Sequence, residues 1–224
     1  MKLRSTISLF LCAALVAAFV GCGASDASAS KPDAGPAAAF DPIANNGKEI
    51  VMAIRSANSD RVASMRGEVW PNKGKWQDSN AYFAKLMGDG GRSPILERIP
   101  FRVFADGGVT IATDAEELKR KGNVWTMLAG IGRCPDSRTP FLWTRNLRLT
   151  QADLEAYARN PDAERSLAAR LDPLVEPFGT DCVVMITKGG AVFEIKAPKL
   201  TTKAFFGGVE LDPSAVEIVE ALPD

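Results

Sequence analysis

The segment 45–65 carries apolar and polar side chains in the pattern of an amphipathic helix. Ile50, Ala53 and Ile54 recur at intervals of three and four residues, which places them on one face of a helix. Asn46 lies just before this pattern, where its side chain can cap the first turn. The pattern therefore predicts a long helix whose apolar face packs against another element.

Short apolar segments after this helix predict strands. Residues 123–131 are apolar on both faces, which is typical of an interior strand, and Phe141 to Arg145 is expected to be its neighbour. Further strands are expected at 99–104, 109–111 and 204–206. Short helices are expected at 80–88, where Ser79 is the predicted cap, at 151–171, opened by Thr150 with Asp153, and at 213–222.

Residues 182–196 read as a β-hairpin around Gly189-Gly190. A two-residue turn at this pair would place Ile186 opposite Phe193, with one face of the hairpin in the core and the other at the surface. Together with the helices, this predicts an α+β fold in which a long N-terminal helix packs on an antiparallel β-sheet, with short extra helices. Residues 45–224 are expected to form a single globular domain.

The first residues read as an export signal, because Lys2 and Arg4 precede an apolar run from Ile7 to Val20 that is too short to span a bilayer. Residues 22–44 are rich in Ala, Ser, Pro and Gly, and this composition predicts a flexible tether. The domain boundaries are therefore 1–21 for the signal peptide, 22–44 for the tether and 45–224 for the domain.

The end of the leader, Phe19-Val20-Gly21-Cys22-Gly23, resembles the lipobox of bacterial lipoproteins. The resemblance implies cleavage before Cys22 and acylation of its thiol, for example with palmitate. The chain would then be anchored to a membrane of the cell envelope and face the periplasm or the exterior, and Gly23 favours the outer membrane. The alternative is an ordinary signal peptide cleaved within 24–29.

The charge balance excludes several partners. The chain has 27 basic and 27 acidic side chains, which argues against nucleic acid and against an anionic membrane surface as the partner. It has no histidine, and this excludes Ser-His-Asp and Cys-His catalysis as well as histidine metal sites. Two carboxylate pairs, Asp106 with Asp114 and Glu116 with Glu117, flank a turn or lie on an exposed helix. We therefore expect no enzymatic activity, no cofactor and no metal.

Cys134 and Cys182 are the two cysteines expected in the exported domain. An oxidising compartment and an even count favour a disulfide between them, and both were expected at strands of one sheet. The alternative is a pair of buried free thiols.

Several short motifs, in a shared order, resemble the exported domains of type II secretion pseudopilins. The motifs, which cover most of 45–196, are Asn46-Gly47, Ile50 to Ala57 with Asn58 and Asp60-Arg61, Val69-Trp70-Pro71, Tyr82-Phe83, Leu86-Met87, Asn123-Val124-Trp125, Pro140, Thr144-Arg145-Asn146, Pro177-Phe178-Gly179, and Lys188-Gly189-Gly190-Ala191 with Phe193. The resemblance implies a pilin-like fold, an envelope location and no catalysis. It also raises a calcium site, for which the loop carboxylates are Asp89, Asp106, Asp136 and Asp181, although their spacing forms no ion-binding loop pattern.

One departure from that family is important. Pseudopilins keep an uncleaved apolar helix start after their processing site, whereas this chain has the lipobox and the tether there, so it is expected to be re-anchored by lipid.

Two candidate functions follow from these expectations. The first is a structural or assembly lipoprotein that contacts secretion-apparatus or other envelope proteins, with Trp70, Trp76, Trp143 and Phe205-Phe206 as core or contact residues. The second is a solute-binding lipoprotein with a pocket between helix and sheet.

Overall fold

The structure is a computed structural model that describes residues 36–64, 68–88, 95–96, 98–105, 109–175 and 178–223, and the side chains from residue 42 onward. The signal peptide, Cys22 and most of the tether lie outside these ranges. The described part combines helices with a five-stranded antiparallel sheet, so the predicted α+β class is confirmed.

The sheet has the strand order β4-β3-β2-β1-β5. Its strands are β1 (Trp125–Ala129), β2 (Pro140–Thr144), β3 (Cys182–Thr187), β4 (Val192–Lys196) and β5 (Glu217–Val219). All residues of β1, β2 and β3 are buried, which requires cover on both faces of the sheet. The predicted strands at 123–131 and 141–145 are therefore confirmed as interior neighbours.

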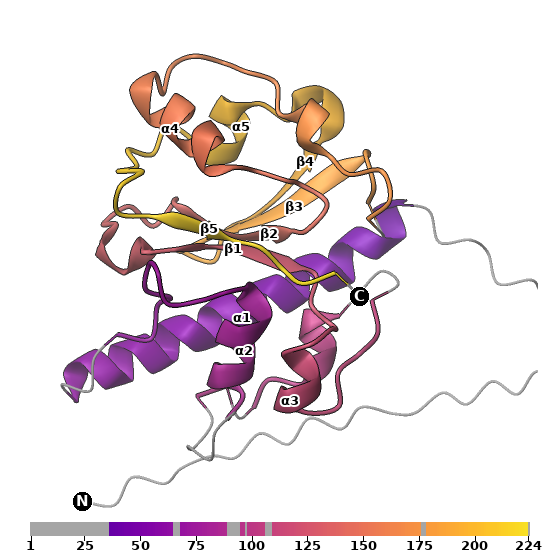
Figure 1. Cartoon of the computed structure of the whole chain (residues 1–224), viewed down its shortest axis with the longest axis vertical. Helices are drawn as coiled ribbons and strands as arrows, with labels where there is room; N and C mark the ends of the chain where they lie inside the picture. The colour runs from indigo at the N-terminus through magenta and orange to yellow at the C-terminus, as the bar shows by residue number, and fades with distance from the viewer. Residues whose placement is uncertain are drawn as a thin grey trace, which may run out of the picture. The chain divides into compact units, whose positions relative to one another are not determined.

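One face of the sheet is covered by α1 (Pro36–Ala63), α2 (Ser79–Leu86), α3 (Ala115–Leu118) and the 3-10 turn η1 (Phe101–Phe104), which lie below the sheet in Figure 1. Ile50 and Ile54 of α1 are fully buried. Gly47 lies so close to the sheet that a Cβ there would meet Ile186 Cδ1 and come within 2.6 Å of the Trp125 ring. Only glycine fits at this approach.

The opposite face is covered by α4 (Gln151–Arg159) and α5 (Thr202–Phe206), above the sheet in Figure 1. The Trp143 ring of β2 meets Phe205 edge to face at 5.5 Å, and Tyr157 of α4 stacks on Phe206 at 4.3 Å. Aromatic pairs of this geometry add to the burial that joins the two layers. The remaining 3-10 turns are η2 (Ile131–Arg133), η3 (Ala168–Arg170) and η4 (Ala197–Lys199).

The register predicted for the 182–196 hairpin is wrong by one residue. Ile186 pairs with Val192 and Met185 with Phe193, and the Thr187 amide donates to the Ala191 carbonyl, so the loop has three residues, 188–190. Gly190 alone in this loop takes a positive φ, 86°, as in a turn that closes with a glycine bulge. Because both faces of β3 are buried, the predicted division into a core face and a surface face also fails for this strand.

Two predicted helix starts are corrected. Helix α1 begins at Pro36, so Asn46 lies inside it and does not cap it, and residues 36–44 of the predicted tether are helical. Ile43 is already buried within that stretch. The cap of α2 is Asp78 and not Ser79 as predicted. The Asp78 carboxylate accepts from the Ala81 amide at 2.7 Å, whereas the Ser79 hydroxyl donates to the Trp125 carbonyl.

In the tail, the structure has a helix where a strand was predicted and a strand where a helix was predicted. Residues 202–206 form α5, capped by Thr201 and ended by Gly207 at a φ of 63°, whereas the strand in the tail is β5. Phe101–Phe104 is a 3-10 turn and not a strand, and 109–112 has no regular structure. The helix predicted at 151–171 ends at Arg159, while its start is confirmed by the reciprocal capping bonds of Thr150 and Asp153.

Candidate functional site

An open groove of about 780 Å³ lies between β5 and the start of α4. We call it the β5 groove. Its lining residues are Lys73, Leu149, Thr150, Gln151, Glu155, Pro213, Ser214, Glu217, Ile218 and Glu220. They come from three distant segments of the chain, which the sheet and its covering helices bring together.

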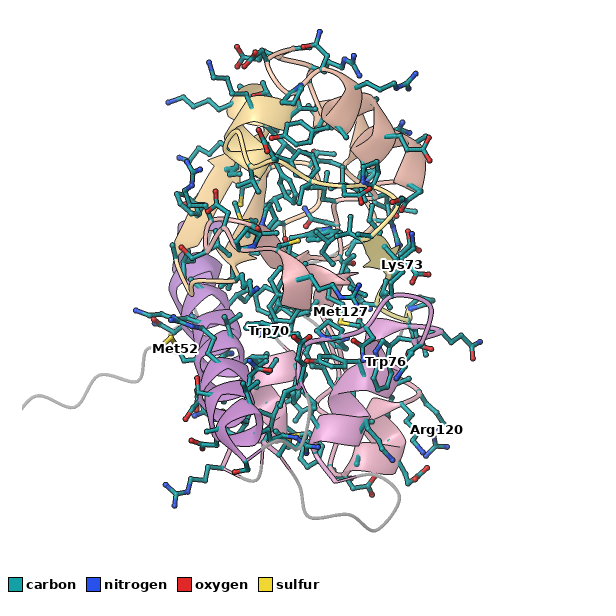
Figure 2. All side chains as sticks on the ribbon, turned by 90° about the vertical axis from the view of Figure 1, so that its left-hand side faces the viewer. Met52, Trp70, Lys73, Trp76, Arg120 and Met127 are labelled. Carbon is teal, nitrogen blue, oxygen red and sulfur yellow. The ribbon has the colours of Figure 1, made fainter. Side chains whose placement is uncertain are left out.

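One rim of the β5 groove is held by hydrogen bonds between two loops. The Lys73 ammonium donates to the Ser214 carbonyl at 2.6 Å, and the Glu217 carboxylate accepts from the Gly74 amide at 2.6 Å. Asp212 accepts from both the amide and the hydroxyl of Ser214, at 2.8 and 2.6 Å. This rim is therefore ordered before any ligand arrives. Figure 2 shows Lys73 beside the sheet, on the side away from Met52.

The other wall is the first turn of α4. The Thr150 amide and hydroxyl both donate to the Asp153 carboxylate, which also accepts from Arg170 at 2.8 Å. Gln151 spans the groove floor and donates from Nε2 to the Pro213 carbonyl at 2.9 Å. Both walls of the groove are thus fixed by bonds made within the protein.

The lining of the β5 groove combines acidic and apolar side chains. Glu155, Glu217 and Glu220 contribute three carboxylates against the single ammonium of Lys73. Two further cations lie near these carboxylates. Arg148 is 3.9 Å from Glu220 and is shared with Asp172, and the Arg159 guanidinium donates to the Glu155 carbonyl at 3.3 Å. Leu149 and Ile218 supply the apolar part. These carboxylates and apolar side chains make the groove suited to bind cationic groups.

A second polar region surrounds the Lys188 ammonium, at the tip of the β3–β4 hairpin. Its Nζ donates to the carbonyls of Ile131, Gly132 and Cys134, at 2.9, 3.2 and 2.6 Å, and lies 5.5 Å from the centre of the Trp70 ring. Burial lowers the pKa of Lys188. Because its three donors are directed at three carbonyls, this lysine fastens the turn after β1 to the hairpin and is not a nucleophile.

A buried cluster of Ser79, Asn80 and Asn123 is also structural. The Asn123 side chain accepts from the Trp125 amide at 2.9 Å and donates to the Ser79 hydroxyl at 2.8 Å and to Asn80 Oδ1 at 3.1 Å. Asn80 in turn bonds the Leu118 carbonyl and the Leu222 amide. The cluster joins α2, α3, β1 and the C-terminal tail. The Ser79 hydroxyl donates to the Trp125 carbonyl and accepts from Asn123, so both of its bonds belong to this cluster.

The structure does not bring Cys134 and Cys182 together. Both are free thiols. The Cys134 carbonyl accepts from Lys188, just beyond the end of β3, whereas Cys182 begins β3. The predicted bridge is therefore not present in this structure. Burial raises the pKa of both thiols, that of Cys182 to about 11.

The candidate acid–base pairs have structural roles. Asp114 caps α3 by accepting from the Glu117 amide at 2.7 Å, and Glu116 pairs with Lys119 at 3.0 Å. Glu117 accepts from Lys121 and from the amide and hydroxyl of Thr113. Asp106 lies outside the described residues.

Of the four carboxylates raised for calcium, Asp136 and Asp181 lie in the described residues. Asp136 is held by the Arg138 guanidinium at 2.6 Å, and this lowers the pKa of Asp136. Within the ranges that the structure describes, no three potential metal ligands come together. Asp89 and Asp106 lie outside these ranges.

Glu117 gives a pH prediction. The hydrogen bond from Lys121, followed by those from Thr113, lowers the pKa of Glu117 from 4.5 to about 2. A lowered carboxyl pKa stabilises the fold above the unfolded value and loses that contribution as the pH falls toward the folded value. We expect the stability difference between wild type and Glu117→Gln to shrink between pH 5 and 2 in urea titrations. Lys121→Met, which removes the largest cause, should reduce the same difference, and an unchanged difference across this range would contradict the assignment.

No family model, no curated protein and no solved structure matches this chain. In the described residues, no helix is both long and apolar enough to cross a membrane.

Sequence reasoning missed the β5 groove, because its walls come from segments far apart in the chain. Of the aromatic residues expected in the core or at a contact, Trp70, Trp143, Phe205 and Phe206 are at most 6% exposed and belong to the core, and Trp76 is partly buried against it.

Proposed function

We propose that this chain is a non-enzymatic lipoprotein of the bacterial cell envelope that acts through contacts with other proteins. The observation that carries the proposal is the shape of the β5 groove, which is an open channel beside an edge strand and not an enclosed pocket. Open grooves of this kind suit a polypeptide segment, whereas small molecules are usually bound in enclosed pockets. The partners would be secretion-apparatus or other envelope proteins.

The anchor is proposed from the leader. The lipobox-like sequence around Cys22 supports lipidation. Cys22 precedes Ile43, the first buried residue among the described side chains, by about 20 positions, which leaves chain between the lipid and that residue. We expect palmitate to label the wild-type protein and not Cys22→Ala. Labelling or normal processing of the variant would contradict the lipid anchor.

A pseudopilin-like arrangement is also proposed. The apolar face of α1, with Ile50 and Ile54 buried over an antiparallel sheet, supports it. The layer of α4 and α5 on the opposite sheet face is an addition that the resemblance did not lead us to expect.

The solute-binding alternative receives less support. Its expected pocket lay between the long helix and the sheet, and Gly47 is in direct contact with Ile186 and Trp125 in that place. A ligand would have to displace these fully buried side chains.

Photo-crosslinking in intact envelopes tests the protein-contact function. A photoreactive residue at Glu155, in the β5 groove, should form a discrete crosslink to another protein. The matched control is the same residue at Met52, which is 47% exposed and lies on the side of the molecule away from Lys73 of the groove in Figure 2. Crosslinks from Met52 and none from Glu155, or recovery of a small molecule only, would contradict the proposal.

A further inference from the structure

We propose that the β5 groove receives an extended segment rich in lysine or arginine from a partner protein, which adds to the sheet as a new strand beside β5. This inference rests on the proposed protein-contact function and names the chemistry of the partner. It is carried by the backbone of β5, by the walls of the groove and by its charge.

The backbone register leaves Ile218 with free hydrogen-bonding groups at the sheet edge. The Arg145 amide donates to the Val124 carbonyl, so the backbone groups of Val124 point toward β2. Backbone groups alternate in direction along an antiparallel strand. Residues 126 and 128 therefore also bond toward β2, whereas residues 127 and 129 bond toward β5. In β5, Val219 and Glu217 pair with Met127 and Ala129, and the N–H and C=O of Ile218 therefore point away from β1. The described residues provide no partner for them.

The neighbouring structure limits this edge at one end and leaves it open at the other. The Ser79 amide donates to the Glu220 carbonyl at 2.8 Å, so α2 occupies the edge beyond Ile218. Before that point, the edge faces the β5 groove, whose volume of about 780 Å³ is enough for a short extended peptide. Leu149 and Ile218 offer apolar contacts to alternate side chains of such a strand.

The charge of the groove selects a basic segment. Glu155, Glu217 and Glu220 face the space into which the added strand would project its side chains. The Lys73 ammonium donates to the Ser214 carbonyl and the Glu217 carboxylate accepts from the Gly74 amide, so these two charges are already engaged at the rim. Glu155 and Glu220 are therefore the carboxylates that an added strand would meet. Lysine or arginine side chains at alternate positions would pair with these carboxylates, and like-charged acidic side chains would be repelled.

The other edge strand, β4, provides the contrast. By the same register, its residues Val192, Glu194 and Lys196 direct their backbone groups outward, but both signs of charge lie side by side there. No residue of β4 lines the β5 groove, whereas β5 contributes Glu217 and Ile218 to it, so β5 is the favoured edge.

Binding of synthetic peptides to the full-length protein in detergent tests the inference. The probe is a fluorescent peptide of alternating lysine and valine, and the controls are its glutamate–valine counterpart and a copy N-methylated at alternate residues. We expect saturable binding of the lysine peptide only, with slower hydrogen exchange at the Ile218 amide. Equal binding of the N-methylated peptide would show electrostatic attraction without strand addition and would overturn the inference.

Ile218→Pro is the decisive variant. It removes an amide that makes no bond to β1, so the sheet should keep its stability, and proline is tolerated at this kind of edge position. We expect peptide affinity to fall about tenfold. The matched control, Val192→Pro on the outward edge of β4, should bind as wild type. Should Ile218→Pro unfold, the N-methylated peptide on the wild-type protein still tests strand addition, and Glu155→Lys with Glu220→Lys tests the charge preference separately.

The outcomes separate this inference from the proposed function. Unchanged affinity in a folded Ile218→Pro variant, or equal losses in Val192→Pro, would overturn strand addition. If Glu155 still crosslinked to a protein in envelopes, the protein-contact function would stand and only the chemistry of the partner would be wrong.

Discussion

Replacing Asn123 with leucine should lower the free energy of unfolding by about 3 kcal/mol. The substitution removes the acceptor of the Trp125 amide and the donor to Ser79 and Asn80, all of them buried. Leucine has nearly the same shape as asparagine, so the lost stability would come mainly from the buried Trp125 amide left without an acceptor and not from a cavity. Urea unfolding followed by tryptophan fluorescence and circular dichroism measures this change.

Asn72→Leu is the control for this prediction. Asn72 is exposed, and its replacement should change stability by less than about 0.5 kcal/mol. Equal effects of the two variants would mean that the Asn123 cluster does not join α2, β1 and the tail as described.

Trp143→Ala should destabilise the fold by about 3–5 kcal/mol. The Trp143 side chain is 1% exposed, packs on Phe205 and donates from Nε1 to the Leu147 carbonyl at 3.2 Å. Its removal opens a cavity between the sheet and α5. A single cooperative transition at lower denaturant concentration is expected, because the α4–α5 layer belongs to the same core as α1 and α2.

Phe193→Ala serves as the comparison on the same sheet face. Phe193 is 47% exposed, so its truncation should cost much less than that of Trp143. A two-step transition for Trp143→Ala, or a loss no larger than that of Phe193→Ala, would show that the α4–α5 layer is independent of the sheet.

The sequence predicted those features that depend on local patterns of sufficient length. The apolar runs at 125–129 and 140–144 were long enough to show burial on both faces, and the Thr150–Asp153 cap marked the start of α4. Shorter elements were misread. Phe205-Phe206 suggested a strand, although Thr201 before it and Gly207 after it are the cap signals of the short helix that forms.

The remaining misses came from interactions that no local pattern reports. The hairpin register depended on which glycine of Lys188-Gly189-Gly190 takes a positive φ, and Lys188 is fixed by carbonyls of a distant turn. The cysteines are free thiols, and Cys134 follows the η2 turn instead of ending a strand as the disulfide prediction assumed. The β5 groove depends on the arrival of 213–220 beside α4, which is set by tertiary packing.

Hydrogen–deuterium exchange on the full-length protein in its native envelope, compared with the same protein purified in detergent, tests the central claim most directly. The account predicts slower exchange in the envelope at 217–220 and at the start of α4, because a protein partner occupies the β5 groove there. Exchange that is the same in both states at these residues, or protection confined to β4, would contradict it.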